Sequence, residues 1–282
     1  VTNAQYAEFL NAKAAADPLG LFNASMELSI YGGIARSGVA GTYTYAAKPW
    51  RANKPVNYVS FYDSLRFSNW LNNGQGSGDT ETGSYTLLGG TSTPSNGLTV
   101  TRNEGANIVL TSGNEWYKAA YYNPASASFF DYPAGSDVQT TCAAPGATPN
   151  TANCNTVFGN VTDVGSYTGS ASPSGTFDQG GNVFEWTDEI IAGAYRGQRG
   201  GSFNYYHFYL QASSRNQDGP VYEVGSLGFR VASIPEPATG LLVMTGLLGL
   251  AGWRRRGAQG GWPCDTDTRF RVGLERRRLQ AG

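Results

Sequence analysis

The chain has 282 residues, 40% of them hydrophobic and 15% charged, which is enough apolar material for one sizeable globular core. With 17 Tyr, 13 Phe and 6 Trp beside 38 Gly, the composition excludes a disordered chain and favours a compact, loop-rich fold. The formal net charge is −1. Because residues 254–282 contain eight Arg and three acidic residues, a balance of +5, the remainder carries −6 and lacks the basic face that nucleic-acid binding requires.

Hydrophobic spacing and capping patterns predict three helices. The first covers residues 2–15 and places Tyr6 and Phe9 on one face. The second covers residues 60–73, and the third begins at Ser112. The expected N-caps are Thr2 or Asn3, Ser60 with Asp63 at the N3 position, and Ser112 with Glu115 at the N3 position.

The rest of the body is rich in Gly, Ser, Thr, Asn and Pro, without an internal repeat, and is predicted to be largely irregular. Short strands are expected at 97–102, 107–111, 197–203 and 227–232. The chain starts at Val1 rather than at an initiator Met, and we expect an N-terminal segment with a secretory signal to precede it.

Two of the three cysteines, Cys142 and Cys154, lie in one loop with eleven residues between them. In an exported protein they could form a local disulfide, which would stabilise the fold by about 3 kcal/mol on the chain-entropy estimate. Two free loop thiols are the alternative. A zinc site is not expected, because the chain has neither a CxxC pair nor a histidine cluster.

A different pattern begins at residues 233–237 (SIPEP). Residues 238–253 form an uncharged run of apolar, Gly and Thr residues, which as a helix would span about 24 Å, just short of a bilayer core of ~30 Å. Arg254, Arg255 and Arg256 follow at once and would remain in the cytoplasm. We therefore predict a short transmembrane helix; a buried core helix is the alternative.

Pro235, Glu236 and Pro237, followed by the apolar run and the Arg cluster, resemble the PEP-CTERM sorting signal of Gram-negative bacteria. The resemblance implies export, transient anchoring in the inner membrane through residues 238–253, and processing by an exosortase-type transpeptidase. The protein would then reside at the periplasmic or outer surface or in the extracellular matrix. Such signals end soon after the basic cluster, whereas here a basic tail of 26 residues follows (257–282), which we expect to be disordered.

Seven short sequence blocks follow one another along the body of the chain. They are 1–9 (VTNAQYAEF), 54–63 (KPVNYVSFYD), 110–116 (LTSGNEW), 163–167 (DVGSY), 181–186 (GNVFEW), 199–203 (RGGSF) and 227–231 (LGFRV). Together they resemble the domain of the formylglycine-generating enzyme, or sulfatase-modifying factor, family over residues 1–232. The resemblance implies a single irregular α+β domain, related to C-type lectins, with little regular secondary structure.

Asp178 and Glu185 flank a glycine-rich turn, so two carboxylates could converge on a calcium ion, which prefers oxygen ligands. The family resemblance implies that calcium is bound by the side chains of Asp178 and Glu185 and by the backbone carbonyls of Gly181 and Val183. It also implies a second calcium ligand at Asn153. The alternative is a turn in which Glu185 caps backbone amides.

The family's oxidase binds copper(I) through two cysteines that follow its R-G-G-S block, and it converts a substrate cysteine to formylglycine. In this chain Tyr205 and Leu210 occupy the approximate positions of those cysteines. Neither side chain is a thiolate, so we expect neither copper nor catalytic residues. His207 is the single histidine, which leaves no iron-binding cluster, and no nucleophile-elbow motif supports a Ser-His-Asp hydrolase.

The aromatic segment after residues 199–203 is a candidate ligand site. Aromatic faces beside Arg and Asn side chains suit glycan or peptide binding through stacking and hydrogen bonds. Packing of alternate aromatic residues into the core is the alternative. The candidates are Tyr205, Tyr206, His207, Phe208 and Tyr209, with Arg215 and Asn216, which resemble the family's cleft-lining A-x-R element.

The sequence therefore predicts an exported, surface-sorted protein that has lost the family's oxidase chemistry. It would serve as a calcium-stabilised binding or structural module of the cell envelope or extracellular matrix. A formylglycine-generating oxidase acting on sulfatase cysteines is the alternative. An extracellular enzyme of another type on the same fold is a third interpretation.

Overall fold

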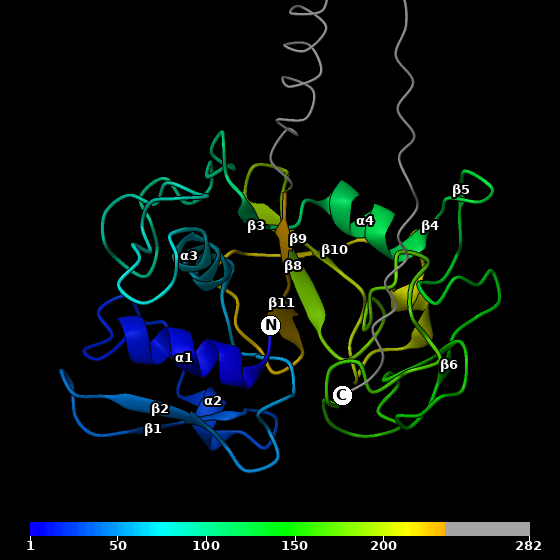
Figure 1. Ribbon diagram of the computed structural model, residues 1–282, viewed down its shortest axis with the longest axis horizontal. Helices are drawn as coiled ribbons and strands as arrows, with labels where there is room; N and C mark the ends of the chain where they lie inside the picture. Colours follow the sequence, from blue (N-terminus) through cyan, green and yellow to red (C-terminus); the bar gives the residue numbers. More distant parts are fainter. Residues whose placement is uncertain (235–282) are drawn as a thin grey trace, which may run out of the picture. The chain divides into compact units, whose positions relative to one another are not determined.

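The computed structural model describes residues 1–234 (Figure 1). The predicted sorting residues, the membrane segment 238–253 and the basic tail lie outside the described residues. Within residues 1–234, no helix is long and apolar enough to cross a bilayer. The helices are α1 (Asn3–Lys13), α2 (Ser25–Leu28), α3 (Phe61–Asn72), α4 (Gly113–Tyr121) and the 3-10 helix η1 (His207–Leu210).

The strands are mostly short and form small sheets around one larger sheet. They are β1 (Ile34–Ser37), β2 (Thr44–Ala47), β3 (Ile108–Leu110), β4 (Tyr122–Asn123), β5 (Ser128–Phe129), β6 (Thr141–Cys142), β7 (Thr151–Ala152), β8 (Phe184–Ile191), β9 (Tyr195–Arg199), β10 (Asn216–Asp218), β11 (Leu227–Phe229) and β12 (Val231–Ser233). The larger sheet has the order β10-β9-β8-β11, in which only the β8–β11 pair is parallel.

Sequence reasoning located the strands only in part. A strand lies within 107–111, and β11 and β12 cover most of 227–232 with β12 ending at Ser233, but the expected strand at 197–203 ends at Arg199. The strand expected at 97–102 is wrong, because backbone bonds from Gly97 to Pro94 and from Thr99 to Asn96 close turns there. The long strand β8 was not anticipated at all.

Each of the three predicted helices begins at a predicted cap. Thr2, Ser60 and Ser112 accept hydrogen bonds from the backbone amides of Gln5, Asp63 and Glu115, and each of these side chains accepts in return from the cap's backbone. Such reciprocal capping satisfies amide groups that the first helical turn leaves without a partner. Of the two caps proposed for α1, the structure has Thr2.

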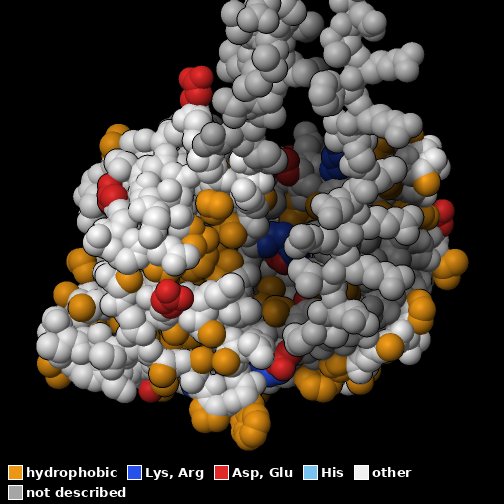
Figure 2. Space-filling model, in the orientation of Figure 1, with side chains coloured by type: hydrophobic (Ala, Val, Ile, Leu, Met, Phe, Trp, Pro, Cys, Tyr) orange, Lys and Arg blue, Asp and Glu red, His pale blue; other side chains and the backbone are white. Residues whose placement is uncertain are grey.

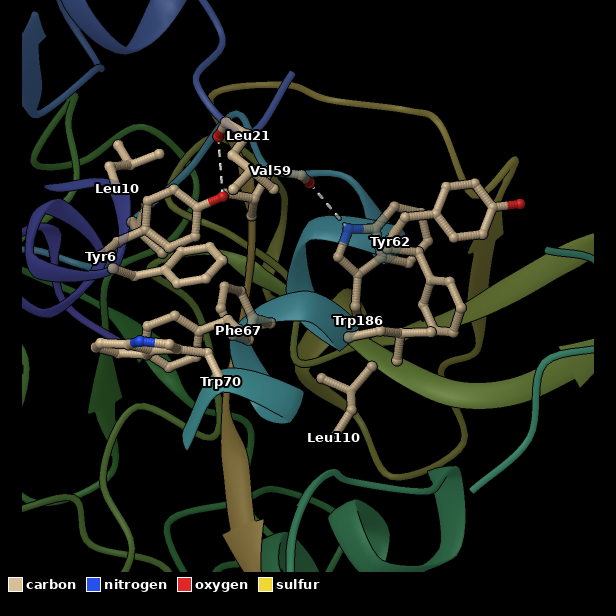
Figure 3. Packing of buried hydrophobic residues seen from close by; sticks show 14 of the residues in the cluster. Tyr6, Leu10, Leu21, Val59, Tyr62, Phe67, Trp70, Leu110 and Trp186 are labelled. Carbon is tan, nitrogen blue, oxygen red and sulfur yellow. Dashed lines mark hydrogen bonds between the residues drawn. The ribbon is translucent and has the colours of Figure 1, made fainter. Parts of the chain in front are cut away.

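One core cluster joins the N-terminal helices to the large sheet (Figure 3). Tyr6 and Phe9 of α1 pack against Phe67 and Trp70 of α3, with ring centroids 5.3–5.9 Å apart. Trp186 of β8 is fully buried, and its indole nitrogen donates to the Val59 carbonyl at 3.1 Å. The core thus satisfies the polar atoms of its aromatic residues while it buries their rings.

The elements are arranged around strands β8, β9 and β11 (Figure 1). Helix α4 contacts β8 and β9, and helix α3 contacts β3, which in turn contacts β8. The β1–β2 hairpin lies against α1. Residues 122–180 form the loop-rich region drawn in green on the other side of the sheet from α1 and α3.

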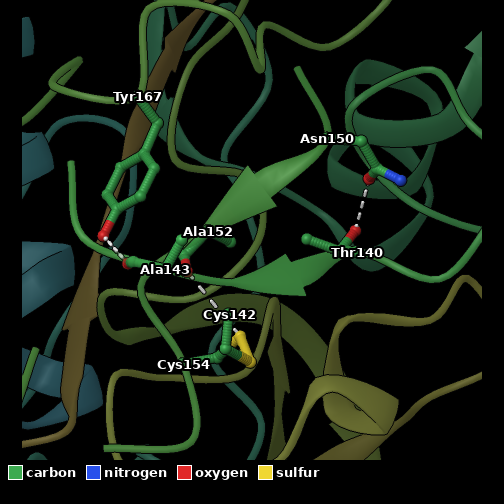
Figure 4. The surroundings of a disulfide bond; sticks show 7 residues. All are labelled: Thr140, Cys142, Ala143, Asn150, Ala152, Cys154 and Tyr167. Carbon is green, nitrogen blue, oxygen red and sulfur yellow. Dashed lines mark hydrogen bonds between the residues drawn. A yellow bond between two sulfur atoms is a disulfide. The ribbon is translucent and has the colours of Figure 1, made fainter. Parts of the chain in front are cut away.

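Cys142 and Cys154 are joined by a disulfide (Figure 4). Cys142 ends β6, which pairs in parallel with β7, and Cys154 is fully buried against Leu210. The next residue, Asn155, donates its amide to the carbonyl of Tyr205 at 2.7 Å. The disulfide therefore closes the loop 142–154, and the hydrogen bond of Asn155 joins the end of this loop to the aromatic segment that follows β9.

Asp63 is a buried carboxyl group, 3% exposed, which accepts hydrogen bonds from Ser60. Burial raises the pKa of Asp63 to about 8, and the neighbouring Glu223 carboxylate acts in the same direction. Burial also raises the pKa of Glu223. The folded state therefore favours the protonated forms of both groups.

The Cys142→Ser, Cys154→Ser double variant should be less stable than the parent chain by about 3 kcal/mol, because its unfolded state is no longer cross-linked. For a domain of this size that corresponds to a melting temperature lower by about 6–12 °C. Thermal denaturation under oxidising conditions measures the change, with Cys264→Ser as the control that keeps the disulfide. An unchanged melting temperature would contradict a stabilising role.

Asp63→Asn should flatten the pH dependence of stability. Since the pKa of Asp63 is about 3.9 in the unfolded chain and about 8 in the fold, its stabilising contribution is complete below pH ~4 and is lost as the pH rises through 8. Urea unfolding between pH 4 and pH 9 measures this decline in the parent chain. Parallel curves for parent and variant would show that Asp63 does not titrate in this way.

Candidate functional site

The expected calcium-binding turn leads directly into β8. Asp178, Gly181 and Asn182 have positive φ values of 56°, 78° and 64°, so the backbone turns sharply there. At Gly181 a Cβ atom would lie only 2.3 Å from the Asn153 carbonyl oxygen. Only glycine fits this close approach, which explains one residue of the 181–186 block.

The carboxylate of Glu185 is buried between two donors. The Trp116 indole nitrogen donates to Glu185 Oε2 at 2.6 Å, and Arg230 Nη2 donates to Oε1 at 2.6 Å, while Arg230 Nε also contacts Oε2. Arg230 Nη2 donates further to the carbonyl of Asp178 at 3.1 Å. Glu185 is thus paired with a guanidinium and an indole, and the proposed alternative of amide capping is wrong.

The four expected calcium ligands line one cavity of about 380 Å³, together with Arg230. Burial raises the pKa of Asp178, and its Oδ2 atom accepts from the Gly165 amide at 2.7 Å. Carboxylates and backbone carbonyls are the oxygen types that calcium takes, but the ion needs about six to eight of them, and here Arg230 already pairs with Glu185 while the Val1 ammonium group lines the same cavity. A calcium ion there would share Glu185 with Arg230.

Asn153 lies behind this cavity rather than in its lining. Its amide nitrogen donates to Asn160 and Asn182, while its Oδ1 atom is buried without a hydrogen-bond partner among the described residues. Within residues 1–234, no cluster of three or more His, Cys, Asp or Glu side chains surrounds any point.

The 199–203 block holds the aromatic segment against the sheet. Arg199 is buried and donates to the carbonyl oxygens of Ala212 and Ser214. Gly200 and Gly201 have φ values of 95° and 70°, and a Cβ atom on Gly201 would lie 2.8 Å from Leu210. The two glycines allow the chain to turn back so that Leu210 packs on it.

The two positions that resemble the family's catalytic cysteines have different environments. Tyr205 is 37% exposed, and its ring meets that of Phe184 edge-on at 5.0 Å. Leu210 is fully buried beside the disulfide. Both cysteines within residues 1–234 are in that disulfide, so the described part of the chain holds no free thiol.

Tyr205 and Asn216 line the same pocket, of about 250 Å³, which opens over β8, β9 and β10. Sequence reasoning missed the other polar residues of its lining because they are separated along the chain and belong to no motif. The pairing of β9 with β10 brings Gln198 beside the residues of β10. The full lining is Phe184, Gln198, Tyr205, Asn216, Gln217, Asp218, Tyr222, Val224, Ser226 and Leu227.

The remaining ligand candidates lie outside this pocket. Tyr206 and Phe208 are exposed and stack on each other with centroids 5.7 Å apart, while His207 and Tyr209 are half-buried. Arg215 lies over the ring of Tyr117, with its guanidinium carbon 5.3 Å from the ring centroid. The expected site is therefore divided: Tyr205 and Asn216 line this pocket, and Tyr209 packs edge-on against Tyr205 with ring centroids 5.0 Å apart.

Charged side chains are sparse on the face of the molecule shown in Figure 2. Lys and Arg side chains do not gather into a patch on this face, where hydrophobic and uncharged polar groups prevail. Contacts made by this face would therefore depend on apolar and neutral polar groups.

Among solved structures, the crystal structure of CarF resembles this chain with a TM-score of 0.53 and 21% identity, covering 83% of this chain and 84% of that one. Variable protein 1 of Treponema denticola has a TM-score of 0.48 and 21% identity over 66% of this chain and 73% of its own. PvdO from Pseudomonas aeruginosa has a TM-score of 0.43 and 18% identity over 71% of this chain and 68% of its own. The likeness to CarF shows a shared fold of small helices and strands.

No protein of curated function matches the chain by sequence. Residues 233–256 match the PEP-CTERM protein-sorting motif, which marks an exported, membrane-transiting protein that an exosortase-type sorting system recognises. Residues 1–234 match the sulfatase-modifying factor enzyme 1-like domain. Since this match covers most of the chain and the fold agrees with it, the protein belongs to the sulfatase-modifying factor enzyme 1-like family.

Proposed function

We propose that this exported protein is a binding module of the cell envelope or extracellular matrix, and that its domain no longer performs the family's oxidation. One observation carries the proposal: Tyr205 and Leu210 stand where the resemblance places the copper-binding thiols, and Leu210 is sealed in the core. A phenol and a buried alkyl group cannot bind copper(I) as thiolates do. The chain therefore retains the family's fold, whereas a phenol and an alkyl group stand in place of the two thiols.

The proposed location follows from the sorting motif. Residues 238–253 would anchor the chain transiently in the inner membrane, and an exosortase-type enzyme would process it for the periplasmic or outer surface. The relation of the fold to C-type lectins, implied by the sequence blocks, remains a prediction.

Calcium is proposed as a structural ion of the domain. The support is that Asp178, Gly181, Val183 and Glu185 all line one cavity. Calcium would neutralise the buried Asp178 carboxylate and fix the turn that precedes β8. The free Oδ1 atom of Asn153 supports this residue as a second calcium ligand, adjacent to the first site through Gly181.

Loss of the oxidase reaction can be tested with the full chain, copper(I) and a sulfatase-derived cysteine peptide. We expect no peptide-dependent oxygen consumption and no aldehyde in the peptide by mass spectrometry, because residues 1–234 hold no free thiol pair that could bind copper. An active formylglycine-generating enzyme serves as the positive control. Formation of formylglycine would overturn the proposal and support the alternative function, a formylglycine-generating oxidase.

Calcium should raise the melting temperature of the chain, because an ion that binds only the folded state stabilises it by about 2.7 kcal/mol at 100 times its Kd. Asp178→Asn, or the harsher Asp178→Ala, Glu185→Ala pair, should abolish this rise. Asp163→Asn is the matched control, since Asp163 is exposed and paired with Lys54 instead. If Asp178→Asn keeps the full calcium effect, the ion binds elsewhere.

A further inference from the structure

Two acidic side chains, Asp63 and Glu223, are neighbours in the fold although 160 residues separate them in sequence. Asp63 belongs to helix α3 and is 3% exposed, and Glu223 lies on the loop 219–226 between β10 and β11. Within residues 1–234, no Lys or Arg forms an ion pair with either carboxyl group. Since neighbouring carboxylates repel each other in a protein interior, such a pair retains a proton.

Hydrogen bonds hold loop 219–226 on the start of helix α3. The amide of Phe61 donates to the Pro220 carbonyl at 3.0 Å, and the amide of Tyr58 donates to the Val224 carbonyl at 3.1 Å. Glu223 lies between the two carbonyl groups that accept these bonds. The attachment of the loop therefore brings its carboxyl group to the N-terminal turn of α3.

Asp63 is fixed in place and has no free cation beside it. Its Oδ2 atom accepts from the amide of Ser60 at 2.9 Å and from the Ser60 hydroxyl at 2.7 Å. Arg66, one turn further along α3, is paired with Glu81 at 2.7 Å and donates its other bonds to backbone carbonyls. Burial and the Glu223 carboxylate raise the pKa of Asp63 to about 8, against the opposite effects of Ser60 and Arg66.

The groups around Glu223 are also acidic or neutral. Asn23 donates its side-chain amide to Glu223 Oε2, and burial raises the pKa of Glu223. The nearby Asp17 carboxylate accepts from two backbone amides, and burial raises its pKa as well. Tyr6 of α1 is fully buried, donates to a backbone carbonyl, and has its pKa raised by burial, so its phenol stays neutral. Nothing in these surroundings favours a second negative charge on the pair.

We propose that Asp63 and Glu223 form a pH-dependent switch, in which a proton held by the pair keeps loop 219–226 on helix α3 and loss of that proton at alkaline pH releases the loop. The loop is the part that moves, because Asp63 is fixed in a buried helix. Next to Glu223, in contrast, Val221 and Tyr222 are 57% and 45% exposed. Release carries Glu223 into water, where its charge is solvated and the repulsion is relieved.

Opening of the loop would reshape two hollows of the surface. Tyr222 and Val224 line the pocket of about 250 Å³ over β8, β9 and β10. Pro220 and Val221 line a separate groove of about 540 Å³. The same loop thus supplies part of both walls. The switch goes beyond the proposed binding function, because it concerns the loop itself and operates with or without a ligand.

The amides of Phe61 and Tyr58 report directly on the loop. Phe61 is the first residue of α3, and an amide at this position has no partner within its helix, so its protection depends on the Pro220 carbonyl. Pulse-labelled hydrogen exchange on the full chain measures both protection factors at pH 7 and pH 9, corrected for the intrinsic pH dependence of exchange. We expect about a tenfold fall, since a group that titrates near pH 8 shifts the opening equilibrium about tenfold per pH unit above it.

Three variants test the assignment of the switch to this pair. Glu223→Gln keeps an acceptor oxygen but cannot ionise, so it should abolish the fall in protection, and Asp63→Asn should do the same. Asp163→Asn is the matched control, because the Asp163 carboxylate is exposed and paired with Lys54, and it should behave as the parent chain does. If Asp63→Asn does not fold, Glu223→Gln alone decides.

A reference amide separates opening of the loop from unfolding of the whole domain. Asn182 is buried and its amide donates to the Asn153 carbonyl at 2.9 Å, so it exchanges through global unfolding. Phe61 and Tyr58 should be at least about tenfold less protected than Asn182 at both pH values. The switch is refuted if their protection does not fall between pH 7 and pH 9, if it equals that of Asn182, or if Glu223→Gln shows the same fall as the parent chain.

Discussion

The buried carboxylate of Glu185 constrains the whole arrangement of this domain. A carboxylate taken out of water is costly unless charged and polar donors surround it. Arg230 and Trp116 supply those donors from segments 45 and 69 residues away in sequence. These contacts join three segments at the Glu185 carboxylate: helix α4, strand β8 and the residue between β11 and β12. The position of the large sheet relative to α4 depends on them.

Strand β8 separates the two candidate sites. Val183 and Glu185 line the cavity in which calcium is proposed, and Phe184, the residue between them, lines the pocket beside Tyr205. Since neighbouring residues of a strand face opposite ways, one short segment serves both sites. An ion that fixes the turn before β8 would also fix the position of Phe184 and of the ring of Tyr205 that packs on it.

Local features of this fold were predictable from the sequence, and distant ones were not. The helix starts depend on residues three apart, so the patterns at Thr2, Ser60 and Ser112 were sufficient. The pairing of Arg230 with Glu185, and of Gln198 with Asn216, depends on strand register, which no local pattern encodes. For the same reason sequence reasoning found Tyr205 and Asn216 but not the polar groups that join them in one pocket.

Because Cys142 and Cys154 form a disulfide, complete folding of the domain depends on the redox state of the compartment in which it folds. Disulfides form in oxidising compartments and are rare in a reducing cytoplasm. The loop that this bond closes supports the backbone of Tyr205 through Asn155. For an exported chain this bond would therefore form after translocation, at the place where the pocket wall beside Tyr205 is needed.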